Sequence, residues 1–138
     1  MVAMTCTAIL VFIAGFHFYW GFGGTVGLGV AVPQNDAGEP IFTPSTAAAH
    51  LIGLALLAAA LCVLACSTFI VLPVPPQFIR LIVTLLAAIF TVRALCWFRY
   101  AGFFKKVHTT RFGRYDTWLY CPLCLVLGLG LLYVVAES

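Results

Sequence analysis

The stretch from Pro44 to Leu72 has the sequence PSTAAAHLIGLALLAAALCVLACSTFIVL and contains no Lys, Arg, Asp or Glu. A helix needs about 20 consecutive, mainly apolar residues to cross a hydrocarbon core about 30 Å thick, so this stretch is long enough to span a membrane. Its repeated Ala, with Gly53 among them, allows close approach between helix backbones, within one chain or between copies of it.

Three further stretches, at about residues 3–22, 78–98 and 117–136, are also long and mainly apolar, and Arg80 and Arg93 in the second of them are their only charged residues. The whole chain of 138 residues is 64% apolar and 8% charged, with a mean hydropathy of +1.13. A water-soluble domain has roughly a quarter of its residues charged, which excludes a cytosolic enzyme, a nucleic-acid-binding domain and a disordered tail. The expected fold is therefore all-α: one integral membrane four-helix bundle that occupies residues 1–138.

The first stretch is not a signal peptide by its pattern. No Lys or Arg precedes it, and it ends in the aromatic run from Phe16 to Trp20 instead of a small-residue cleavage site. We therefore expect a retained helix.

The connections between the spans are short. Loop one, residues 23–43, is rich in turn-forming Gly, Pro, Asn and Asp, and Thr43 before Pro44 predicts the N-cap of the second span. Loop two, residues 73–77, is short enough to make spans two and three antiparallel neighbours. Loop three, residues 99–116, holds most of the charge.

The distribution of that charge predicts the orientation. Loop three has five cationic residues, and the opposite side of the bundle has only Arg80: the five are Arg99, Lys105, Lys106, Arg111 and Arg114. The positive-inside rule then places loops one and three in the cytoplasm and both termini outside. The predicted location is the inner membrane, with several passes.

A weak repeat favours a construction from two repeated helical hairpins. Tyr19 to Phe22 (YWGF) ends span one, and Tyr100 to Phe103 (YAGF) follows span three on the same side. The alternative is that both strings belong to the aromatic belt that membrane proteins place at the interface.

Polar residues gather in the part of the spans near loops one and three. Because polar groups are costly in lipid, they are the best candidates for a site. One interpretation is structural: Arg93 pairs with Asp116 or reaches the headgroups, and the His side chains bond to neighbouring helices. In the other, a pocket binds the anionic or carbonyl head of an amphiphile (a lipid, quinone or isoprenoid), or a partner helix, with Arg93 as the anion partner. The candidate ligand-binding residues are His17, Tyr19, Trp20, His50, Arg93, Arg99, Tyr100, Asp116 and Tyr120.

Cys121 and Cys124 form a CxxC pair at the start of the fourth span, where a helix N-terminus favours the thiolate. This pattern suggests, as an alternative, a quinone-linked membrane thiol oxidoreductase with these two residues as weak catalytic candidates. The predicted cytoplasmic side is reducing, which disfavours it. The other four cysteines are expected to be small apolar residues.

Other functions are less favoured. No His or Cys spacing typical of a metal site occurs, so no metal is expected, and no acidic residue lies in the middle of a span as coupled transport requires. Enzyme activity and cofactors stay open. An accessory subunit of a larger membrane complex and a homo-oligomer remain alternatives.

Several strings together resemble a family of small bacterial four-span membrane proteins catalogued as a domain of unknown function. They are residues 17–20 (HFYW) with Gly23 and Gly24, residues 99–105 (RYAGFFK) and residues 119–124 (LYCPLC), beside residues 40–45 (PIFTPS). The resemblance implies the four-helix architecture and no activity. Members of the family more often carry Ser at the position of Cys121, which would leave no CxxC pair.

Overall fold

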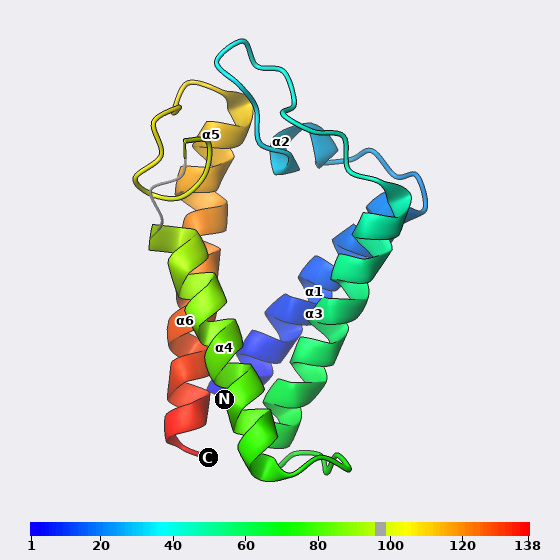
Figure 1. Cartoon of the computed structure of the whole chain (residues 1–138), viewed down its shortest axis with the longest axis vertical. Coiled ribbons are helices and arrows are strands. Elements are labelled where there is room, and N and C mark those ends of the chain that lie inside the picture. Colours follow the sequence, from blue (N-terminus) through cyan, green and yellow to red (C-terminus); the bar gives the residue numbers. More distant parts are fainter. Residues whose placement is uncertain (96–98) are drawn as a thin grey trace.

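Figure 1 shows the computed structural model, which describes residues 1–95 and 99–138. The helices are α1 (Val2–Gly21), α2 (Leu28–Ala31), α3 (Thr46–Cys66), α4 (Pro76–Leu95), α5 (Arg111–Tyr115), the π-helix η1 (Asp116–Tyr120) and α6 (Cys121–Ala136). Four helices are long and apolar enough to cross a membrane, the last being the continuous run Arg111–Ala136. The described residues contain no β-strand, which confirms the predicted all-α bundle.

The four long helices form two pairs. Helix α1 packs mainly on α3, and α4 packs mainly on α6. The pairs converge where both termini and the α3–α4 connection lie, and they diverge toward the end that carries α2 and α5 (Figure 1). We call the diverging part the loop end.

The hydrophobic core lies where the pairs converge. It contains small and branched apolar side chains from all four helices: Ala3, Cys6, Leu10, Ala59, Ala60, Val63, Cys66, Ile79, Val83, Ala87, Leu127, Leu131 and Val134. Small residues permit this close contact, since a Cβ at Gly130 of α6 would lie 2.6 Å from Cys6 Sγ of α1. The exposed apolar side chains face outward and suit contact with lipid.

Helix α3 is shorter at both ends than the apolar run predicted. Its N-cap is Ser45, whose Oγ accepts a hydrogen bond from Ala48 N at 3.1 Å, so the prediction of Thr43 was wrong. With Ser45 as the cap, Pro44 precedes the helix, where its missing N–H leaves no bond unmade. At the other end Thr68 has a φ of 61°, a left-handed conformation that stops the helix before the apolar residues 69–72.

The last membrane helix begins at Arg111 instead of residue 117. Thr110 caps it by accepting a hydrogen bond from Gly113 N at 2.9 Å, so the charged residues that suggested a loop are helical. Helix α4 ends at Leu95. The predicted end of that span at residue 98, and Cys96, lie outside the described residues.

The predicted hairpins are present as the α1–α3 and α4–α6 pairs, but the two strings that suggested a repeat differ in structure. Gly21 is the last residue of α1, whereas Gly102 lies in the α4–α5 connection with a φ of +96°. The sequence similarity between them therefore reflects no shared local conformation.

Candidate functional site

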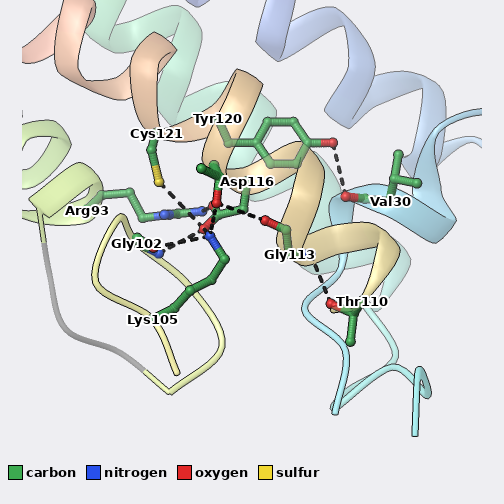
Figure 2. Close-up of polar contacts among 10 residues, drawn as sticks. Val30, Arg93, Gly102, Lys105, Thr110, Gly113, Asp116, Tyr120 and Cys121 are labelled. Atoms are coloured by element: carbon green, nitrogen blue, oxygen red, sulfur yellow. Dashed lines mark hydrogen bonds and ion pairs between the residues drawn. The ribbon is translucent and has the colours of Figure 1, made fainter. Parts of the chain in front are cut away.

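A buried carboxylate with three nitrogen partners organises the loop end. The Asp116 side chain is fully buried, and its Oδ1 accepts a hydrogen bond from Arg93 Nη2 at 2.7 Å. Its Oδ2 accepts one from Gly102 N at 2.8 Å and lies 3.2 Å from Lys105 Nζ. Figure 2 shows these groups around the carboxylate, and we call Arg93, Gly102, Lys105 and Asp116 the Asp116 cluster.

The π-helix places Asp116 in this cluster. Pro122 has no N–H, and in an α-helix its ring would clash with the carbonyl of Trp118. The chain widens before it, and the amide of Cys121 donates to Asp116 O, five residues back. Cys121 Sγ also lies 3.5 Å from Asp116 Oδ2. In an α-helix these two side chains would point about 140° apart, so the wide turn is what brings them together. Such π turns occur often at functional sites.

The α4–α5 connection folds back to supply the other two members of the cluster. Phe103 N donates to Ala94 O at 2.9 Å, which turns the chain toward the end of α4. The left-handed φ of Gly102 aims its amide at Asp116, a conformation that a residue with a Cβ adopts at a cost. Lys105 is 2% exposed, and its Nζ also donates to Gly102 O and Thr117 Oγ1.

The Asp116 cluster has one more positive than negative charge. Two cations, Arg93 and Lys105, share a single carboxylate. Arg93 Nη1 is buried and has no hydrogen-bond partner among residues 1–95 and 99–138, whereas the Arg93 side chain as a whole is 31% exposed. Because an unpaired donor and an unbalanced charge are both costly in a low-dielectric surrounding, the cluster is suited to an additional anionic oxygen.

Loop one bonds to the last membrane helix at two points and to the α4–α5 connection at a third. Tyr120 OH donates to Val30 O at 3.1 Å, and Phe112 N donates to the Gln34 side chain at 3.1 Å. Arg99 and Asp36 form an exposed ion pair at 3.5 Å. Loop one thus covers the helix that carries Asp116.

The two histidines among the candidate residues, His17 and His50, belong to the other helix pair. His17 Nδ1 bonds to Ile13 O at 2.9 Å, and His50 Nδ1 bonds to Thr46 O at 2.8 Å, each four residues back on its own helix. Since a carbonyl only accepts, each Nδ1 carries a proton. His17 packs edge-on against Trp20, and His50 packs against Phe18 and Phe22. Tyr19 and Trp20 bond to the backbone of Val26.

The predicted polar layer therefore divides into two groups. Arg93, Asp116 and Tyr120 lie on the α4–α6 side, whereas His17, Tyr19, Trp20 and His50 lie on the α1–α3 side. Arg99 packs over the Tyr100 ring at 5.4 Å in the connection next to the first group. Among the residues that the structure describes, no hydrogen bond or ion pair joins a histidine to the Asp116 cluster.

The five cysteines that the structure describes are free thiols. Cys121 is fully buried and Cys124 is half-buried. No group of three His, Cys, Asp or Glu side chains within the described ranges is arranged to hold a metal ion. The thiol oxidoreductase remains an untested prediction that no contact of the CxxC pair favours.

Sequence reasoning missed the part that Lys105 and Gly102 play. From the sequence, Lys105 is a loop charge that predicts the orientation and the last residue of the string RYAGFFK, yet in the structure it is buried against Asp116. The string RYAGFFK contains both residues, and a Gly three positions before a Lys in a charged loop was the available signal. Nothing in that spacing shows that the chain turns back on α4.

One protein-family model matches the chain, over residues 10–131, and its description is protein of unknown function (DUF3995). The same comparisons find no matching curated protein and no matching solved structure. The match covers nearly the whole chain and confirms the resemblance that the strings from His17 to Cys124 indicated. The chain, with its four helices long and apolar enough to cross a membrane, thus belongs to the DUF3995 family of proteins of unknown function.

Proposed function

We propose that this protein binds the anionic head of an amphiphile next to Arg93 at the loop end. The observation that carries the proposal is Arg93 Nη1, which no group in the described part of the chain bonds, in a cluster where two cations share one carboxylate. A ligand oxygen would supply both the missing acceptor and the missing negative charge. A phosphate or a carboxylate fits best, because the guanidinium binds either one through parallel hydrogen bonds.

The position of Arg93 suits a ligand with an apolar tail. Arg93 lies in the last turn of α4, so a head bound there has its tail beside the membrane-spanning part of the helix. Exposed apolar side chains occur along α4 below it, among them Val92, Ile89 and Leu85. They offer contact to a hydrocarbon chain, and not to a water-soluble anion.

The proposal includes an orientation in a bacterial inner membrane, with loops one and three in the cytoplasm and both termini outside. Six of the seven Lys and Arg residues belong to the loop end, and Arg80 lies at the other end of α4. A reporter fused after Ser138 tests it. Alkaline phosphatase there should be active and green fluorescent protein dark, and the opposite result would reverse the orientation.

Native mass spectrometry of protein released in mild detergent tests the ligand. The wild-type chain should retain one discrete added mass, and that mass separates a phospholipid from a fatty acid or an isoprenoid phosphate. Arg93→Lys keeps the positive charge beside Asp116 but loses the guanidinium fork. It should lower retention about tenfold, as the loss of a charge-assisted hydrogen bond implies.

The matched control is Arg80→Lys, the same change at the exposed opposite end of α4, which should retain the ligand as the wild type does. A wild-type chain that carries no small molecule, and regains none when phosphatidylglycerol or oleate is added, would overturn the proposal. A protein that co-purifies with such a bare chain would instead indicate an accessory subunit.

A further inference from the structure

A second surface at the loop end has chemistry of its own, on the outer side of α5 and η1. Its residues follow one another at helical spacing and all are exposed: Arg111, Arg114, Tyr115, Trp118 and Leu119. The side chains between them, Phe112 and Asp116, are buried. We call the five exposed residues the α5–η1 outer face.

The length of the last membrane helix shows where this face lies relative to a bilayer. The run Arg111–Ala136 has 26 residues, whereas α1, α3 and α4 have 20, 21 and 20. At 1.5 Å per residue, the excess of about six residues is about 9 Å, enough to reach from the hydrocarbon into the headgroups. The extra turns carry Arg111 and Arg114.

The order of residues on the face matches the layers of a membrane surface. The two Arg residues come first along the chain. Trp118 lies seven residues after Arg111, which is about 10 Å further into the span. Trp and Tyr favour the interface, and Arg favours the phosphates above it. Trp118 is 83% exposed, an unusual state for an indole unless lipid covers it.

The charge on this face is unbalanced. The only acidic residue of α5 and η1 is Asp116, which points inward to Arg93 and Lys105. Among the described residues, neither Arg111 nor Arg114 has an acidic partner. From these observations we infer that the α5–η1 outer face binds the headgroups of anionic phospholipids in the leaflet at the loop end. This surface is separate from Arg93 and stands whether or not an amphiphile binds there.

Tryptophan quenching by brominated lipids tests the inference. Wild-type protein is reconstituted in mixtures of phosphatidylcholine and phosphatidylglycerol, with one or the other brominated, and the quenching gives the preference for the anionic lipid. Each Arg near an anionic surface contributes about fivefold to such a preference at low salt. The preference for the anionic lipid should therefore fall at least fivefold in the variant R111Q/R114Q. In the wild type the same preference should weaken in 0.5 M NaCl, because salt screens the charges.

The control is R80Q/K106Q, which removes two exposed positive charges outside the face and should stay within twofold of the wild type. Equal preference in the wild type and in R111Q/R114Q would overturn the inference, and would leave an acidic protein segment as the occupant to seek. An equal loss in the control would also overturn it, because net charge and not this face would then be responsible. Retention of the amphiphile at Arg93 is measured separately by mass, so failure of one proposal is distinguishable from failure of the other.

Discussion

The two helix pairs satisfy their polar groups in different ways. In the α1–α3 pair, His17 and His50 bond to carbonyls four residues back on their own helices. In the α4–α6 pair, Arg93 and Asp116 are 23 residues apart and bond across helices, with Lys105 added from the connection. A local bond survives when neighbouring helices move, whereas a bond across helices is lost with the packing. Stability at the loop end should therefore depend far more on the second pair.

The largest effect is expected from Asp116→Asn. The change leaves the buried Lys105 and the half-buried Arg93 side by side without a negative charge, and removing one partner of a buried ion pair costs about 3 to 5 kcal/mol. Thermal unfolding in detergent should show a large fall in midpoint. The control Asp36→Asn breaks an exposed pair, which contributes about 1 kcal/mol at most. Equal falls in the unfolding midpoint of the two variants would contradict the inference that Asp116 holds the loop end together.

The second-largest loss of stability is expected from Lys105→Met. It removes an ammonium group that contacts Gly102 O, Thr117 Oγ1 and Asp116 Oδ2. Arg93 still balances the carboxylate, so the loss should be limited to about 1.5 to 3 kcal/mol, the contribution of hydrogen bonds to a charged group. Lys106→Met, at the exposed neighbouring position, should unfold like the wild type in the same assay. If it matched Lys105→Met, the buried position of Lys105 would be wrong.

Gly21→Ala tests the packing of the other pair. A Cβ there would lie 2.6 Å from His50 Cε1, so the ring must move away from α1, at a cost of about 1 to 3 kcal/mol. Gly15→Ala, on the same helix with nothing within 4 Å, should be neutral or slightly stabilising. The ring carbon resonance of His50 should shift in the first variant alone. An unchanged resonance in Gly21→Ala would show that the two helices are further apart.

The smallest effect is expected from Tyr120→Phe, which removes the hydrogen bond to Val30 O. Loss of one neutral hydrogen bond costs about 1 kcal/mol, and here it should loosen loop one, with the short helix α2, without unfolding the four membrane-spanning helices. Hydrogen exchange should quicken at residues 28–32 only. Tyr133→Phe is the control, since Tyr133 is 54% exposed and its hydroxyl makes no hydrogen bond within the described residues. Faster exchange throughout the chain would mean that Tyr120 holds more than loop one.

Much of the fold was predictable because a span needs only length and apolar composition. The unbroken apolar run around Gly53 shows α3 directly, and the pairing of Arg93 with Asp116 was one of two stated alternatives. Helix ends were harder to predict. Thr43 and Ser45 both suit an N-cap, and only the folded backbone decides which hydroxyl meets a free amide.

The arrangement of the candidate site was less predictable, because it depends on tertiary contacts. The charged residues from Arg99 to Arg114 look alike in sequence, yet Lys105 is 2% exposed and Lys106 is exposed. What separates them is the turn at Gly102, which no local propensity shows. Likewise His17 and Arg93 belong to the same depth of the bundle by sequence, but the two helix pairs keep them in different groups.

The π turn at Asp116–Tyr120 also determines which change of length the last helix can absorb. It accommodates about one residue more than an α-helical turn, so deleting one residue between Asp116 and Pro122 would leave a regular α-helical turn in which Asp116 and Cys121 lie about 40° apart around the helix. Leu127 and Leu131, now fully buried, would then still face the core, whereas one further inserted residue would turn both away from it by about 100°. Insertions should therefore be tolerated in the turn-rich residues 23–43 and not in the five residues of η1.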